Sequence, residues 1–348
     1  MASATASMPF IKNLASSDRK IRTAALDSLK GFLTAKYAAS SAASSQLTFH
    51  DAQKLWAGLF YALWMADRAP AQQRLCDELA GLPAAVRLSD PAVDAWLRAF
   101  WATMAREWTT GIDVLRMEKF MLLVRRVLNA QLAWMAGDSG SGSDGKKPQK
   151  AKTTQKTQTT QTTQKTQKTQ PTTPAHDLGL EILAQWPFNP EGEAEVEAAP
   201  SEDDTDGGDD NNDKETGEAR RPRKRSRKVV PTVHIPVGLT MHAVDIWVDE
   251  AEKLGLLTTA ASEGESQSED TPSLAKEINA LVETLAAKTT APAVRQRTRE
   301  ALEDERLPWV ESTAAPEQAV GGGGIEGQAD SDDDDDAAAD GDWDGFND

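Results

Sequence analysis

The chain has 348 residues, with 38 Lys and Arg against 55 Asp and Glu, and a formal net charge of −17. Residues 1–134 hold 16 basic and 11 acidic residues, which leaves 22 basic and 44 acidic residues for the remainder. One cysteine, Cys76, excludes an intrachain disulfide, and no apolar run reaches the ~18 residues of a membrane span. We therefore expect a soluble intracellular protein with a mildly basic front half and an acidic, solvated remainder.

The first predicted domain, residues 1–135, is a series of amphipathic helices. Apolar residues recur at helical spacing over residues 18–36. The next helix begins where Thr48 and Asp51 form a capping box. A shorter helix covers residues 71–80 and ends in the sequence AGLP.

Two longer helices complete this domain. Asp90 followed by Pro91 predicts a helix start, with a capping oxygen before a proline at the first helical position. Gly111 interrupts the pattern, and Asp113 can cap a new helix. Strand patterns are absent and the loops are short. We predict an all-α domain, either an antiparallel helical bundle or a short helical-repeat stack, although no fixed-length repeat is found.

Composition divides the rest of the chain. A Thr/Gln/Lys linker at 136–175 and an acidic insert with a basic cluster at 191–230 lack the apolar residues of a core, so we predict disorder. Between them, residues 176–190 predict a helical island of one or two turns. Helical segments at 231–305 would complete the domain, and residues 306–348 form an acidic tail, predicted to be disordered.

Three phrases carry a family resemblance. They are KLWAGLFYALWMAD at 54–67, FWATMAREWTTGIDVLRMEKFMLLVRRVL at 100–128 and PVGLTMHAVDIWVDEAEKL at 236–254. In this order they resemble the nucleolar ribosomal RNA-processing protein 1 family, eukaryotic factors of large-subunit assembly. The resemblance covers roughly residues 9–135 and 176–257. The matching positions that we assign to a structural motif are Trp56, Phe60, Trp64, Trp101, Trp108, Asp113, Asp245 and Ile246.

The resemblance implies a non-catalytic nucleolar scaffold in early pre-60S particles, needed for the maturation of large-subunit rRNA precursors. It implies as partners precursor rRNA, ribosomal proteins and other assembly factors of the Brix-domain and WD40-repeat types. The competing interpretation rests on the acidic segments, which would suit a chaperone-like carrier of basic nuclear proteins.

The phrase at residues 100–128 combines tryptophans with many charges. In the structural interpretation, Trp101 and Trp108 anchor helix packing, and Arg106, Glu107 and Asp113 make ion pairs or caps around the bend at Gly111. In the functional interpretation, its cations bind rRNA phosphates or an acidic partner, and the two roles can coexist. The candidate contact residues are Arg106, Arg116, Lys119, Arg125 and Arg126.

The stretch RRPRKRSRK at residues 220–228 has seven basic residues in nine. A solvated counterweight to the preceding acidic residues is one interpretation. We favour a nuclear localisation signal that an import receptor reads. Its residues are Arg220, Arg221, Arg223, Lys224, Arg225, Arg227 and Lys228.

Catalytic and metal-binding patterns are weak. His242, Asp245, Asp249 and Glu250 are close in sequence, but their spacing is not that of a zinc or di-iron site, so surface charge or capping is preferred. No Ser/His/Asp or Cys/His arrangement stands out. We therefore predict no enzyme activity, metal or other cofactor.

Overall fold

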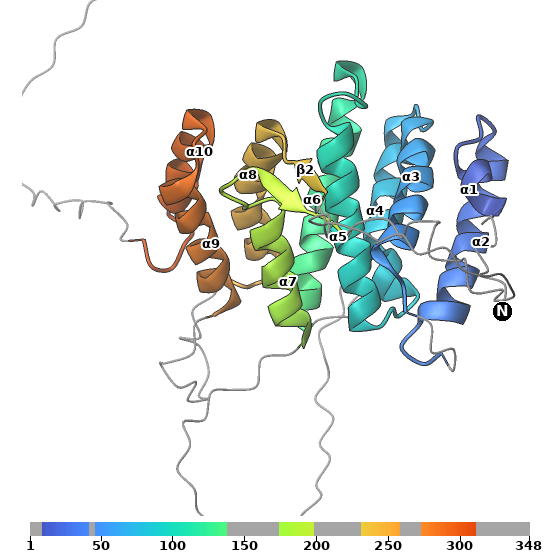
Figure 1. The fold of residues 1–348 in the computed structure, drawn as a ribbon, viewed down its shortest axis with the longest axis horizontal. Helices are drawn as coiled ribbons and strands as arrows, with labels where there is room; N and C mark the ends of the chain where they lie inside the picture. Colours follow the sequence, from blue (N-terminus) through green and yellow to red (C-terminus); the bar gives the residue numbers. More distant parts are fainter. Residues whose placement is uncertain (1–8, 42–45, 138–173, 198–230, 258–272, 311–348) are drawn as a thin grey trace, which may run out of the picture. The chain divides into compact units, whose positions relative to one another are not determined.

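The computed structural model describes residues 9–41, 46–137, 174–197, 231–257 and 273–310, all within one unit that spans Met1–Glu311. These residues form ten α-helices (Figure 1), which confirms the all-α prediction. The helices are α1 (Pro9–Leu14), α2 (Arg19–Tyr37), α3 (Phe49–Trp64), α4 (Ala69–Ala85), α5 (Asp90–Glu107), α6 (Met117–Met135), α7 (Pro174–Gln185), α8 (Val237–Lys253), α9 (Leu274–Lys288) and α10 (Pro292–Leu302). A one-turn 3₁₀ helix, η1 (Val114–Arg116), lies between α5 and α6.

Helix contacts show a repeat stack rather than a bundle. The odd-numbered helices pack in the order α1, α3, α5, α7 and α9, while α4, α6, α8 and α10 pack in the same way in a second layer. Helix α2 packs on α1 and reaches α4 through an ion pair between Lys30 and Glu78. Figure 1 shows the helices side by side from α1 and α2 to α9 and α10. Each pair therefore contacts mainly its neighbours, as in helical-repeat proteins.

Helix starts follow the predicted caps in two places. The Thr48 hydroxyl accepts the N–H of Asp51 at 3.1 Å, and an oxygen of Asp113 accepts the N–H of Arg116 at 3.0 Å. Asp90 departs from the expected capping role: its carboxylate accepts a bond from the Trp134 indole at 3.0 Å. The start of α5 is thus fixed by a contact to α6 rather than by its own cap.

The end predicted for α4 is wrong. The helix continues through Pro83 to Ala85. Proline removes one backbone hydrogen bond, but it lies only two residues before this helix end, and its neighbour Leu82 is buried. Core packing therefore extends the helix by about one turn beyond the sequence signal.

Aromatic residues form much of the core, as the helical stripes predict. Trp56 and Trp101 are fully buried, and the centroid of the Trp56 ring lies 4.9 Å from that of Phe100. The Trp56 indole donates to the carbonyl of Trp96 at 3.0 Å, and the Trp101 indole donates to the Gln131 side chain at 3.0 Å. Because both indole N–H groups have hydrogen-bond partners, the burial of these two rings leaves no indole N–H unsatisfied.

Helix α7 is a full member of the stack, whereas the sequence predicted an island of one or two turns. Its 12 residues pack against α5, α6 and α9. At Gly179 the helix passes so close to α6 that an added Cβ would overlap Met135. Gln131 also donates a hydrogen bond to the Gly179 carbonyl at 3.2 Å.

A short antiparallel sheet was not predicted. Strand β1 (Glu193–Glu195) pairs with β2 (Thr232–His234), with Ala194 opposite Val233. Residues 191–197, which we expected to be disordered, therefore belong to the folded part. Each strand has three residues, too few to show an alternating apolar pattern in the sequence.

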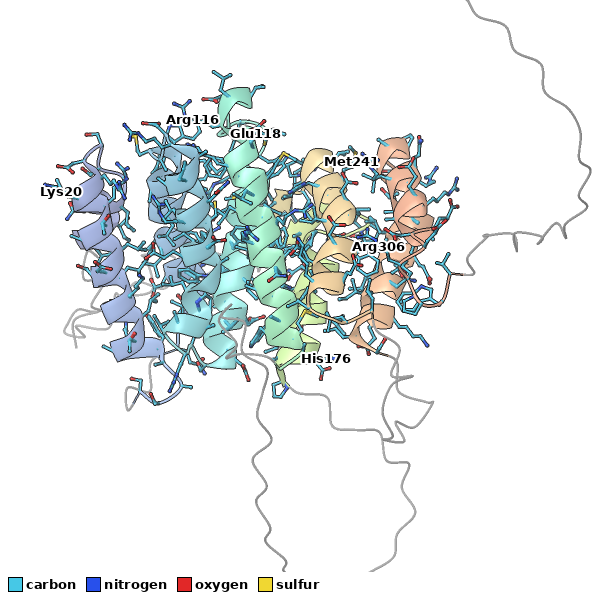
Figure 2. All side chains as sticks on the ribbon, turned by 180° about the vertical axis from the view of Figure 1, so that it is seen from behind. Lys20, Arg116, Glu118, His176, Met241 and Arg306 are labelled. Carbon is cyan, nitrogen blue, oxygen red and sulfur yellow. The ribbon has the colours of Figure 1, made fainter. Side chains whose placement is uncertain are left out.

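The folded part also extends beyond the predicted limit at residue 305. Leu307 is 1% exposed, and Arg306 donates to Asp249 at 3.0 Å and to Glu252 at 2.9 Å. Figure 2 shows Arg306 beside the helices of the last repeats. The remaining predicted linker, insert and tail lie outside the described residues.

Candidate functional site

The three sequence phrases meet in space, and we call their contact region the motif interface (residues 54–67, 100–128 and 236–254). Arg116 stacks over the Trp64 ring, with its guanidinium carbon 4.6 Å from the ring centroid. The same guanidinium forms an ion pair with Asp113. Arg116 therefore contacts both the first and the second phrase while its side chain stays 37% exposed.

Lys119 is not a surface cation. The residue is 5% exposed, and its ammonium donates to the carbonyls of Trp64 at 2.7 Å and Ala66 at 3.0 Å. Burial lowers its pKa. Lys119 thus satisfies carbonyls at the end of α3, where a helix leaves acceptors without partners. This burial contradicts the prediction that Lys119 contacts RNA or an outside partner.

Arg125 connects α6 to α8. Its guanidinium donates to Asp249 and Glu250, both at 3.1 Å. The Glu250 side chain is fully buried and also accepts bonds from Asn129 at 2.9 Å and Lys253 at 2.6 Å. A buried carboxylate needs such partners, so Arg125 has an internal role in place of the predicted external contact.

Arg106 and Arg126 remain on the surface. Arg106 is paired with Glu107 and Arg126 with Asp77, each with a nitrogen–oxygen distance of 2.8 Å. Their side chains are 49% and 42% exposed. Exposed ion pairs of this kind contribute only about 0–1 kcal/mol, so a phosphate can replace the carboxylate. With Arg116, these residues stay predictions for an external contact.

The third phrase is used mainly for packing. A Cβ added at Gly238 would lie 3.0 Å from the Trp108 indole nitrogen. The His242 ring stacks on Trp108, with ring centroids 6.2 Å apart, and its Nε2 lies 2.9 Å from the Met121 carbonyl. Burial lowers the pKa of His242, although the bond to Met121 opposes this shift.

Asp245 and Ile246 complete this phrase. Asp245 forms an ion pair with Arg297 of α10 at 2.8 Å, and Ile246 is 1% exposed. The ion pair fits the predicted surface charge. Burial raises the pKa of Asp245, while Arg297 opposes the shift.

The described residues bear on two kinds of site, a metal site and a reactive thiol. None of their His, Cys, Asp and Glu side chains form a group of three able to hold a metal ion. Burial raises the pKa of Cys76 to about 12, which keeps this thiol protonated at neutral pH. In the same part of the chain, no helix is both long and apolar enough to cross a bilayer.

One surface feature was missed in the sequence. A depression of about 540 Å³ between α2 and α4 is lined by arginines, and we call it the arginine groove (Arg19, Arg22, Arg68 and Arg74). Two of these residues begin α2 and two lie at or near the start of α4. The only sequence signal is a pair of basic residues near each helix start, because the fold alone brings the pairs together.

A second surface feature lies at η1. Val114 and Leu115 are 87% and 93% exposed, the largest fractions among the big apolar residues of the described ranges. The turn that Asp113 begins thus holds two apolar side chains in solvent. The predicted nuclear localisation signal at residues 220–228 lies outside the described residues.

Comparison with known proteins gives consistent matches. The sequence matches the model of a family described as "Nucleolar protein, Nop52" over residues 5–141 and 224–346. Ribosomal RNA processing protein 1 homolog A of Homo sapiens is 37% identical over 121 residues, 35% of this chain and 25% of the human protein. Homolog B of Homo sapiens is 37% identical over 123 residues, 35% of this chain and 16% of that protein. Homolog A of Mus musculus is 38% identical over 121 residues, 35% of this chain and 24% of the mouse protein. The matched segment spans a quarter or less of each relative.

Proposed function

Because this chain belongs to the Nop52 family of nucleolar proteins, we propose that it is a non-catalytic scaffold of early pre-60S particles. In this role it supports the maturation of large-subunit rRNA precursors, and separate proteins with nuclease activity cut these precursors. The names of the curated relatives, ribosomal RNA processing protein 1 homologs, support a part in rRNA processing.

The basic residues fall into an internal group and an exposed group, and this division supports a scaffold function. Lys119 and Arg125 hold neighbouring helices together, whereas Arg106, Arg116 and Arg126 keep exposed guanidinium groups. A rigid stack with outward cations can orient itself on phosphates without reading base sequence. We propose precursor rRNA as the partner of these three arginines.

The exposed apolar pair at η1 supports protein contacts as well. Val114 and Leu115 leave apolar surface in water, which a protein neighbour can cover. We propose that the neighbours include ribosomal proteins and assembly factors of the Brix-domain and WD40-repeat types. An import receptor that reads residues 220–228 would bring the protein to the nucleus.

A truncation separates this proposal from the carrier alternative. The full chain and a chain that ends at Glu311 are each expressed in cells depleted of the endogenous homolog. The scaffold predicts that both co-sediment with pre-60S particles and restore normal levels of the rRNA precursors. Loss of particle association on removal of residues 312–348 alone would favour an acidic carrier and overturn the scaffold.

A charge variant tests the exposed arginines. Arg126→Glu should retain normal thermal stability but weaken association with the particles, because a carboxylate repels phosphates. The control is Asp77→Ala, which removes the partner of Arg126 and leaves its charge available. If Arg126→Glu binds particles as well as the wild type does, this residue has no part in the scaffold surface.

A further inference from the structure

The arginine groove has the geometry of a binding site. It holds about 540 Å³, and its floor includes the apolar residues Leu14, Leu26 and Leu75. Arg22 fixes one wall, because its guanidinium donates to the carbonyls of Ser16 at 2.8 Å and Met65 at 3.2 Å. These bonds join the start of α2 to the end of α3, so the groove is preformed.

The other three arginines are available to a ligand. Arg19, Arg68 and Arg74 are exposed and make no side-chain hydrogen bond or ion pair with another described residue. This distinguishes them from Arg116, Arg125 and Arg126, each of which has a carboxylate partner. A guanidinium without a carboxylate can bind a phosphate with two parallel hydrogen bonds and loses no internal contact.

The charge balance of the groove remains positive. Two carboxylates also line it, Asp67 and Glu78. Glu78 is already paired with Lys30, so its charge is offset within the fold. The lining therefore holds four guanidinium groups against two carboxylates.

The groove continues toward the motif interface. A second hollow of about 240 Å³ shares Ala66 and Asp67 with the first, and its charged lining consists of Arg116, Lys119 and two carboxylates, Asp67 and Glu118. The hollow surface therefore extends from α2 to η1, while the excess of positive charge stays at the arginine groove. A cluster of cations at one end of an extended hollow suits a linear polyanion that is held there by its phosphates.

We propose that the arginine groove binds the sugar-phosphate backbone of RNA, with Arg19, Arg68 and Arg74 contacting phosphates. This proposal rests on the scaffold function, and it adds a site away from the motif phrases. RNA is favoured over an acidic peptide because these three guanidinium groups can each bind a phosphate with two hydrogen bonds, and the apolar floor beside them suits the face of a ribose. No base-specific contact is required, so binding depends on backbone shape and charge.

The test uses the purified full chain and two matched variants. In the groove variant, Arg19, Arg68 and Arg74 are changed to Ala, while Arg22 is kept because of its structural bonds. In the control variant, Lys276, Lys288 and Arg299 on α9 and α10 are changed to Ala; these residues are also exposed and make no side-chain bond with another described residue. Both variants lose three positive charges, so a difference between them reports position rather than net charge.

Binding is measured by fluorescence anisotropy over a salt series. The probes are a labelled single-stranded RNA of about 20 nucleotides, an RNA duplex of similar length and a labelled polyglutamate peptide. The groove variant should bind RNA about 10- to 100-fold more weakly at 0.1 M salt, and the slope of log K against log salt should fall by about 2. The control variant should bind as the wild type does. The two RNA arms show whether the groove takes single strands or duplexes.

Three results would overturn the groove proposal. These are equal RNA binding by both variants, tighter groove-dependent binding of polyglutamate than of RNA, and a wild-type chain that binds no RNA. Thermal melts check that both variants fold; if the groove variant does not, Arg68→Ala and Arg74→Ala are tested singly against Arg299→Ala, with the same criteria. Particle association is measured separately, so the scaffold can survive through protein contacts even when the groove proposal fails.

Discussion

The motif interface and the arginine groove both contain basic side chains, but they differ in how many of these side chains have partners among the described residues. Lys119 and Arg125 in the motif interface bind carbonyls and carboxylates of neighbouring helices. Arg19 and Arg74 in the groove make no such bonds with described residues. The difference shows that a recognisable phrase can mark residues that build the fold, while the residues free for a ligand lie in unremarkable sequence.

The largest effect should come from the core of the stack. Trp101→Ala removes a fully buried ring and leaves the Gln131 side chain without its indole partner. We expect a loss of about 3–5 kcal/mol in the free energy of unfolding, measured by urea denaturation. Arg106→Ala, five residues away on the exposed surface, is the control and should change stability by less than about 1 kcal/mol. A small loss for Trp101→Ala would show that the stack tolerates a cavity there.

The next effect tests the internal role of Arg125. Arg125→Ala leaves the fully buried Glu250 without its guanidinium partner, and we expect a loss of about 3 kcal/mol in unfolding free energy. Arg126→Ala is a matched control because, among the described residues, this neighbour forms an ion pair with the exposed Asp77 alone. If the two variants were equally stable, the contrast between internal and external cations would fail.

A pH-dependent effect should arise at His242. Its ordinary pKa of 6.5 is lowered in the folded protein, chiefly by burial, so the unfolded chain binds a proton more readily. The histidine's contribution to stability is therefore present above pH 6.5 and is lost as pH falls toward the lowered pKa. His242→Gln keeps a donor for the Met121 carbonyl and should lose less stability between pH 7 and 5.5. Asp245, whose pKa is raised chiefly by burial, acts in the opposite direction, and His242 lowers that pKa, so the comparison is made in an Asp245→Asn background.

The smallest effect on stability should occur at η1. Leu115→Asp changes a side chain that is 93% exposed, so thermal stability should change by less than about 0.5 kcal/mol. If Leu115 contacts a protein in the particle, the same variant should reduce co-sedimentation with pre-60S particles, whereas Leu115→Met should not. Normal co-sedimentation of Leu115→Asp would remove η1 from the proposed docking surface.

Local sequence signals predicted the caps at Thr48 and Asp113 and the burial of Trp56 and Trp101, because helical spacing and capping act over a few residues. They did not predict the burial of Lys119. A lysine stem can extend through an apolar layer to distant carbonyls, and the acceptors at Trp64 and Ala66 lie more than 50 positions away in the chain.

The same limit explains the elements that the sequence obscured. Helix α7 buries Ile182 and Leu183 against helices that are distant in sequence, so its short apolar pattern alone did not indicate a full repeat. Strand β1 has only a distant partner, β2. The arginine groove likewise depends on α2 and α4 coming together. The sequence indicates where a residue lies on its own helix, but it does not indicate which helices become neighbours in the stack.

The fit of Gly179 against Met135 has a consequence for how this chain is made. Residues 138–173 separate α6 from the helix that covers it. A ribosome adds about 5–20 residues per second, so it needs several seconds to synthesise this segment. Until α7 emerges, the apolar surface of α5 and α6 that it will cover is exposed to solvent. During this interval the exposed apolar surface of the nascent chain can aggregate. Its synthesis should therefore depend on chaperones that bind apolar segments until α7 packs against α5 and α6.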